Sequence, residues 1–289
     1  MADVLAIEDL HKHFGSGPHA VRANAGVTMR VGAGEVVGLL GHNGAGKTTT
    51  IRILSTLASA TGGTAVVCGR DVNQDPRGVR SSIALTGQFT ALDERLTGRE
   101  NLIMIGRLFG LSKEDATTSA ERLLADFDLE DAADRPVRTY SGGMQRRLDL
   151  AASLSGSPEV IFLDEPTVAL DPQIRRHIWE LVREIAKGGV TVLLTTHYIE
   201  EAEALCGRVS IINKGTLIDV QTPRTFCENL GAYAVEWDDA DGRAYRFFHT
   251  RTEARAHARE IEESMQRVLL RPTNLEDVFI ELTGRKEGL

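Results

Sequence analysis

A glycine-rich segment early in the chain has the composition and spacing of a phosphate-binding loop. Glycines let successive backbone amides curl around an anion, and a helix that begins there points its positive dipole end at the same place. Lys47 supplies a positive charge to the β- and γ-phosphates, and the Thr48 hydroxyl is a ligand for Mg²⁺. A chance glycine-rich turn is the alternative, which the flanking strand and helix disfavour. The predicted nucleoside-triphosphate site comprises Gly41, His42, Asn43, Gly44, Ala45, Gly46, Lys47, Thr48 and Thr49.

Two adjacent acids follow a second apolar run. Residues 160–163 predict a strand that ends at Asp164 and Glu165. Asp164 is expected to hold Mg²⁺, directly or through water, and Glu165 to face the water that attacks the γ-phosphate. A solvated carboxylate at a strand end is the alternative for Glu165. Because the chain also has a phosphate loop, we interpret Glu165 as a catalytic base.

A serine and two glycines at the start of a predicted helix form a third candidate site. Ser141, Gly142 and Gly143 precede an amphipathic segment, so a hydroxyl and unpaired N–H groups would face outward as a second anion site. A simple helix cap is the alternative. The position of these residues, at the end of a helical run and shortly before Asp164, favours the anion site.

The elements that must position these residues alternate between strands and helices. Residues 35–40 form a nearly continuous apolar run, typical of a strand buried on both faces of a parallel sheet. A helix is expected over residues 48–57 and another over 171–187, which has one apolar stripe at helical spacing. A further strand is expected over 190–196. This alternation predicts an α/β fold.

Two changes of pattern divide the chain. From about residue 89 to 155 the spacing of apolar residues is helical, which predicts a helical subdomain inserted into the α/β core. After about Gly231 a hairpin, a helix, a strand and a last helix are expected, so residues 231–289 read as a small α+β appendage. The sequence thus predicts one domain over residues 1–230 and a C-terminal domain over 231–289.

Composition narrows the possible partners. The chain has 289 residues, with 33 Lys and Arg against 41 Asp and Glu and a net charge of −8, which argues against a nucleic-acid partner. Its apolar runs are far shorter than the roughly 20 residues that span a bilayer. We therefore expect any work at a membrane to proceed from the cytoplasmic side through a partner. The cysteines are isolated and are expected to be reduced packing residues: Cys68, Cys206 and Cys227.

Together these motifs resemble the ATP-binding subunit of an ABC transporter, over roughly residues 4–225. The resemblance implies a P-loop NTPase (RecA-like) fold, ATP hydrolysis, and ATP and Mg²⁺ as cofactors. It implies that Phe14 stacks on adenine, and that Gln88 senses Mg²⁺ and contacts the membrane partner. It also implies that Asp171 belongs to the D-loop and that His197 is the catalytic switch histidine near the γ-phosphate. A satisfied strand-end histidine is the alternative for His197. Ser141, Gly142 and Gly143 match the signature motif of the family. This motif departs slightly from the family pattern, since Met144 follows the two glycines.

The resemblance also implies an assembly. In the family the signature loop of one subunit closes on the ATP held by another, so an ATP-sandwich dimer with a second copy or a paralogue is expected. Residues 87–101 and 271–284 resemble bacterial exporters of the daunorubicin-resistance type. This implies export of a drug, antibiotic or lipid-linked compound through an integral membrane permease, with the ATPase on the cytoplasmic face of the membrane.

Other functions remain as alternatives. A soluble, non-transport ABC ATPase acting on nucleic acid or ribosomes usually carries two cassettes, a long coiled coil or zinc fingers, and none is visible in the sequence. An inactive nucleotide sensor would lack Glu165 or His197, and a small-molecule kinase has no use for Ser141. For residues 231–289, a stabilising role and a regulatory role both stay open.

Overall fold

The computed structural model describes residues 3–15, 20–87, 92–239, 242–263 and 267–284. Within these residues the centre is a six-stranded sheet in the order β10-β9-β3-β8-β7-β6. Neighbouring strands are parallel except β10 and β9, which are antiparallel. The strands are β3 (Val36–Leu40), β6 (Ile83–Thr86), β7 (Val160–Asp164), β8 (Thr191–Thr196), β9 (Arg208–Asn213) and β10 (Thr216–Gln221).

The side chains of this sheet contribute to two hydrophobic cores, one on each face, because successive side chains of a strand point to opposite faces. In β7, Phe162 lies in the core that also contains helix α1 (Lys47–Leu54). Ile161 and Leu163 lie in the core on the other face. Every residue of β7 is buried, which explains why the sequence shows a continuous apolar run there.

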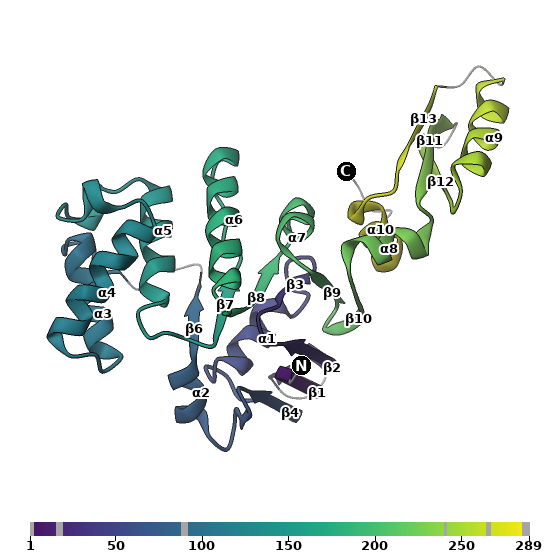
Figure 1. Ribbon diagram of the computed structural model, residues 1–289. Helices are drawn as coiled ribbons and strands as arrows, with labels where there is room; N and C mark the ends of the chain where they lie inside the picture. Colours follow the sequence, from purple (N-terminus) through teal and green to yellow (C-terminus); the bar gives the residue numbers. More distant parts are fainter. Residues whose placement is uncertain (1–2, 16–19, 88–91, 240–241, 264–266, 285–289) are drawn as a thin grey trace.

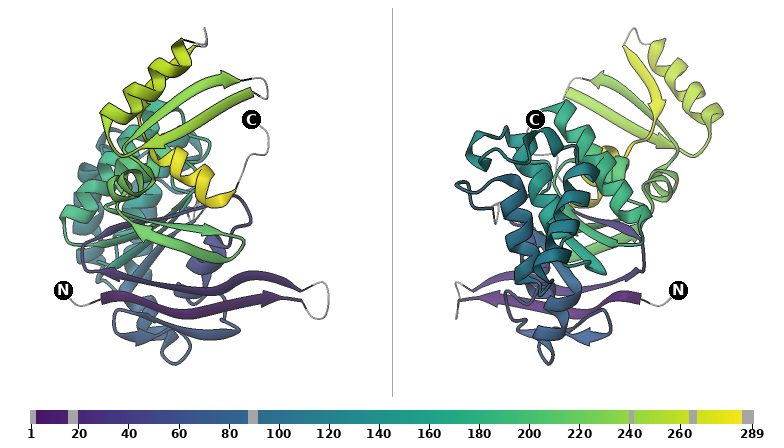
Figure 2. Two further views of the ribbon diagram at one scale, coloured as in Figure 1. Left: turned by 90° about the vertical axis from the view of Figure 1, so that its right-hand side faces the viewer. Right: turned by 60° about the vertical axis from the view of Figure 1, so that its left-hand side comes forward.

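A second sheet covers the α1 side of the central sheet. It has the order β2-β1-β4-β5 and is antiparallel throughout. Figure 2 shows β1 and β2 as two long strands running along one side of the molecule. Of this sheet, only the first strand is predicted by the sequence, since apolar and polar residues alternate at the start of the chain, up to about Phe14. Its elements are β1 (Asp3–Phe14), β2 (Val21–Gly32), β4 (Gly62–Val67) and β5 (Arg70–Asp71), followed by α2 (Pro76–Ser82).

The helices α3 (Gly98–Leu108), α4 (Lys113–Asp126) and α5 (Gly142–Ser153) lie between β6 and β7 in the chain and together at one side of the molecule (Figure 1). Each begins at a side-chain cap. The hydroxyls of Thr97, Ser112 and Ser141 accept hydrogen bonds from backbone N–H groups of the first turn. Such a cap satisfies an amide that has no partner in the helix and contributes about 1 kcal/mol.

The C-terminal residues form a small sheet and then return to the main core. The antiparallel sheet β12-β11-β13 packs with α9 around Val235, Ala254 and Ala258, and Figure 1 shows these elements projecting from the rest of the molecule. The last helix, α10, leaves this sheet and packs against α7 and α8. The elements are α6 (Pro172–Lys187), α7 (Ile199–Leu205), α8 (Pro223–Leu230), β11 (Tyr233–Asp239), β12 (Gly242–Phe248), α9 (Arg251–Glu262), β13 (Val268–Pro272) and α10 (Leu275–Thr283).

The predicted fold class is confirmed: an α/β core, inserted helices and a small α+β C-terminal part. The helices expected over residues 48–57 and 171–187 are α1 and α6. Among the described helices, none combines the length and the apolar character that crossing a bilayer requires.

Candidate functional site

The predicted phosphate loop lies between the end of β3 and the start of α1. Gly46 has φ +108°, and a Cβ there would lie 2.2 Å from the carbonyl oxygen of Ala23, so only glycine fits. The Nζ of Lys47 donates to the carbonyls of Gly41 (2.8 Å) and His42 (3.1 Å). Burial lowers the pKa of Lys47, and the nearby carboxylate of Glu165 opposes this change. The lysine charge is thus held inside the curve of the loop.

Three hydrogen bonds connect the phosphate loop and the first turn of α1 to neighbouring segments of the chain. The N–H of Gly41 donates to the carbonyl of Thr196 in β8 (3.3 Å), and the N–H of Gly215 donates to the carbonyl of Ala45 (2.9 Å). In β2 the buried Asn24 donates to the Thr50 hydroxyl (2.8 Å) in the first turn of α1. Neither Asn24 nor Gly215 was predicted from the sequence. Strand β2 also contains other polar residues, so its local pattern does not distinguish Asn24.

Exposure along the loop fits the binding of an anion from outside. Asn43, Gly44 and Thr48 are exposed and Thr49 is half-buried, whereas Ala45 is buried. These exposed residues of the loop therefore face solvent, where the sequence predicted a triphosphate.

The predicted metal ligands Thr48 and Asp164 come together from α1 and β7. The Thr48 hydroxyl donates to Oδ1 of Asp164 (3.1 Å), and the hydroxyl of Thr195 donates to the same oxygen (2.5 Å). These hard oxygen donors suit Mg²⁺, which commonly takes one or two protein oxygens together with water and phosphate. In the described part of the chain no group of three or more His, Cys, Asp or Glu side chains is placed to hold a metal. Thr195 was not predicted.

Glu165 lies where the predicted catalytic groups meet. Its Oε1 is 3.5 Å from Nζ of Lys47 and 3.2 Å from Nδ1 of His197. Its backbone has φ +52°, a conformation that non-glycine residues seldom adopt. Its N–H donates to both the carbonyl and the hydroxyl oxygen of Thr195 (3.1 Å each). The structure thus directs one largely enclosed carboxylate, 9% exposed, toward the phosphate loop, the geometry that a base for an attacking water requires.

The predicted signature residues lie at the start of α5. Ser141 and Gly142 are exposed, and the Ser141 hydroxyl accepts from the N–H of Met144 (3.2 Å). Gly143 packs against α6, where an added Cβ would lie 2.8 Å from a methyl of Ile174. Within the described residues, Ser141, Gly142 and Gly143 share no hydrogen bond or ion pair with Lys47. The structure therefore does not bring these two parts of the predicted site together within one chain.

Arg146 connects the signature helix to the opposite side of the site. It donates to the carbonyls of Pro166 (2.8 Å) and Gly87 (3.0 Å) and pairs with Asp149 (3.1 Å). Burial lowers the pKa of Arg146, against the opposing effect of nearby carboxylates. Sequence reasoning missed this residue, because nothing in the local pattern distinguishes it from the adjacent Arg147.

The remaining predicted site residues are Phe14, Asp171 and Gln88. The Phe14 ring is 48% exposed at the end of β1, with Nζ of Lys12 5.0 Å from its centroid. Asp171 caps α6 by accepting from the N–H groups of Gln173 and Ile174 (3.0 Å each). Gln88 lies outside the described residues. An exposed aromatic face suits base stacking, and the role of Phe14 stays a prediction.

Family models match two parts of the chain. The model described as "ABC transporter" matches residues 25–168, a range that contains the phosphate loop, the signature residues, Asp164 and Glu165. The model described as "Nodulation factor export protein NodI, C-terminal domain" matches residues 243–284.

Curated relatives match most of the chain. The daunorubicin resistance ATP-binding protein DrrA2 of Streptomyces coeruleorubidus is 44% identical, over 96% of this chain and 94% of its own length. The Nod factor export ATP-binding protein I of Paraburkholderia xenovorans is 40% identical, over 90% of this chain and 92% of its own length.

Solved structures show the same fold. An ATP-binding subunit of an ABC transporter superposes with a TM-score of 0.72 at 24% identity, over 96% of this chain and 99% of that chain. A dimeric ATP-binding cassette in a post-hydrolysis state, with bound ADP and Pi, has a TM-score of 0.68 at 26% identity, over 75% of this chain and 98% of that chain.

The fold, the site and the relatives together define the class of protein. The phosphate loop, the Thr48–Asp164 pair and Glu165 lie within the fold of an ATP-hydrolysing cassette. The chain belongs to the ATP-binding proteins of the ABC transporter family, and it is an ATPase.

Proposed function

We propose that this chain hydrolyses ATP to power export of a drug, an antibiotic or a lipid-linked compound through a separate membrane subunit. The convergence of Lys47 and His197 on one carboxylate oxygen of Glu165 carries the proposal, because a hydrolytic base needs this placement. The names of the relatives, which concern daunorubicin resistance and Nod factor export, support the export of such compounds.

In the proposed reaction the side chains have distinct roles. Lys47 and the amides of the phosphate loop bind the β- and γ-phosphates, and Glu165 accepts a proton from the attacking water. His197 orients Glu165 and contacts the γ-phosphate. Thr48 and Asp164, with Gln88, would hold Mg²⁺, which neutralises charge on the phosphates when bound.

We further propose that the site is completed by a second molecule. Ser141, Gly142 and Gly143 would cap the triphosphate held by a second copy or a paralogue, and Asp171 would lie at the same interface. The exposure of Ser141 and Gly142 at the start of α5 supports this arrangement, since unpaired amides at a helix start favour an anion.

The proposed assembly sits on the cytoplasmic face of the membrane, bound to an integral permease, and acts without nucleic acid. Residues 1–230 are proposed as the ATPase domain, with an inserted helical subdomain at about 89–155, and residues 231–289 as the C-terminal domain. Isolation of the chain from native membranes should recover an integral membrane protein. Recovery with ribosomes or nucleic acid would favour the alternative function.

The shared pocket can be tested with two inactive variants. Lys47→Ala disables the phosphate loop. Ser141→Asp keeps a good helix cap but places a negative charge where the γ-phosphate would lie. Each variant alone should lack ATPase activity. A mixed dimer retains one pocket in which both Lys47 and Ser141 are intact.

Equal mixing should restore about a quarter of the wild-type rate, because random pairing puts half of the chains into mixed dimers with one intact pocket of two. The matched control mixes Lys47→Ala with Ser112→Asp, which alters the cap of α4 and should itself be active. A mixture of the two inactive variants that stays inactive under conditions where wild-type chains dimerise would contradict the shared pocket.

A further inference from the structure

The helix α10 buries its apolar face in the core of the ATPase. Leu275, Val278 and Phe279 are buried in the same hydrophobic cluster as Leu40, the last residue of the strand before the phosphate loop. The small sheet β12-β11-β13 has a separate cluster of its own. The last helix of the chain is therefore anchored beside the nucleotide site.

One aromatic contact joins α10 to the phosphate loop itself. The rings of Phe279 and His42 meet edge to face, with centroids 4.7 Å apart and an interplanar angle of 63°. The carbonyl of His42 accepts from Nζ of Lys47 (3.1 Å) and from the N–H of Ala45 (3.1 Å). Phe279 thus touches the residue whose backbone holds the phosphate-binding lysine.

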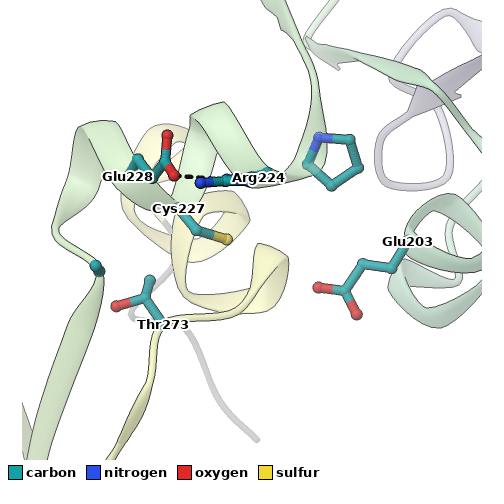
Figure 3. Close-up of a pocket in the computed structure, with 7 residues that line it drawn as sticks. Glu203, Arg224, Cys227, Glu228 and Thr273 are labelled. Atoms are coloured by element: carbon teal, nitrogen blue, oxygen red, sulfur yellow. Dashed lines mark hydrogen bonds and ion pairs between the residues drawn. The ribbon is translucent and has the colours of Figure 1, made fainter.

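A second attachment joins α10 to the helix that follows His197. The N–H of Leu275, the first residue of α10, donates to Oε1 of Glu203 in α7 (2.8 Å). Glu203 and Thr273 both line a cavity of about 380 Å³, and Figure 3 shows the Glu203 carboxylate pointing toward the segment that carries Thr273 and leads into α10. The hydrogen bond to Glu203 thus fixes the start of α10 against α7.

The small sheet holds α10 through a partly buried ion pair. The guanidinium of Arg271 in β13 donates two hydrogen bonds to Asp277 in α10 (2.7 and 2.8 Å) and lies 3.4 Å from a carboxylate oxygen of Glu236 in β11. A paired fork of this kind fixes orientation as well as distance. Contacts therefore run from the small sheet through α10 to His42.

We propose that Phe279 is a positioning residue for ATP binding: by packing on His42, it holds the His42 carbonyl where that oxygen fixes Lys47. This rests on the proposed function, in which the phosphate loop binds ATP. Three glycines give the loop backbone freedom that binding must remove, namely Gly41, Gly44 and Gly46. A ring docked on a side chain of this loop removes part of that freedom before the nucleotide arrives.

The test is ATP affinity of the full chain, measured by calorimetry. Phe279→Ala should weaken binding about three- to tenfold, the scale of one aromatic contact. Phe279→Tyr keeps the ring and should restore most of the affinity. Ile280→Ala, at the adjacent and more exposed position of α10, is the matched control and should bind as the wild type does. Thermal unfolding of each variant reports whether the fold is kept.

A double-variant cycle separates positioning from general destabilisation. In a His42→Ala background, Phe279→Ala should cause no further loss of affinity, since the contact is already gone. An unchanged affinity of Phe279→Ala, or an equal loss in both backgrounds, would overturn the inference. Lys47→Ala distinguishes the two levels of argument: if it binds ATP as well as the wild type does, the proposed function fails as well.

Discussion

The phosphate-loop side and the signature side of the site differ in how far one chain completes them. Nζ of Lys47 and Nδ1 of His197 lie 3.5 and 3.2 Å from the same carboxylate oxygen of Glu165, whose side chain is only 9% exposed. Ser141 and Gly142 are exposed at the start of α5, and the Ser141 hydroxyl accepts from within its own helix. One side is an assembled set of side chains, and the other is a helix start facing solvent.

This difference indicates how hydrolysis is controlled. The side chains proposed for catalysis are positioned by the folding of one chain, whereas amides at an exposed helix start need an anion from elsewhere. We infer that binding and hydrolysis depend on different encounters: the loop with ATP, and the signature residues with a second molecule. The variants described below test this division.

The largest effect is expected at the base. Glu165→Gln should lower turnover by at least ~100-fold, the scale of losing a general base, while ATP binding survives. The measurement is phosphate release together with ATP affinity. Glu159→Gln, an exposed acid next to the other end of β7, is the control and should be active. Undiminished turnover in Glu165→Gln would remove this residue from its role.

Loss of the loop lysine should affect binding itself. Lys47→Ala should weaken ATP binding by about 100-fold, because several hydrogen bonds from a charged donor are lost together. Titration with a fluorescent ATP analogue measures this. Arg52→Ala, on the exposed side of α1, should bind normally. Comparable affinities for Lys47→Ala and the wild type would show that the triphosphate binds elsewhere.

Substitution of Arg146 tests whether this side chain holds the signature helix α5 to the segments that carry Gly87 and Pro166. Arg146→Lys keeps the charge but loses the fork that reaches the carbonyls of Gly87 and Pro166, so stability should fall by about 2 kcal/mol. Urea unfolding measures the change. Arg122→Lys, at an exposed pair in α4, is expected to change stability little. If both variants unfold at the same urea concentration, Arg146 does not hold the two sides together.

A smaller effect is expected at the signature serine. Ser141→Ala should lower turnover about tenfold through loss of one hydrogen bond to a charged phosphate, and should leave ATP binding by the single chain unchanged. Ser112→Ala removes a cap of the same kind from α4 and should cost similar stability without loss of turnover. Equal turnover losses in the two variants would reduce Ser141 to a helix cap.

The smallest effect is expected at the proposed adenine contact. Phe14→Ala should weaken ATP binding about fivefold, in keeping with one stacking contact. GTP binding, measured beside ATP, should fall by a similar factor because any base has a π-face. Phe109→Ala, an exposed ring in the helical region, is the control. Unchanged affinity in Phe14→Ala would place the base elsewhere.

The local pattern of residue types in the sequence was enough to predict the main segments of the candidate site. The phosphate loop, the strand that ends at Asp164 and Glu165, and the helix that begins after Ser141 were predictable, since each is a contiguous segment whose residue types carry its chemistry. The second sheet was mostly missed. Its strands β2 and β4 have irregular burial and contain glycines, so their alternation is weak.

The amino-acid sequence alone was enough to indicate the class of protein and to predict the residues proposed to bind the phosphates, because each motif is a contiguous segment. The bonding of Thr195 to Asp164, the reach of Arg146 to Gly87 and the return of α10 to His42 are visible only in the folded structure. These contacts join residues that are distant in sequence, and no local pattern encodes such pairs. Packing of the whole chain selects them.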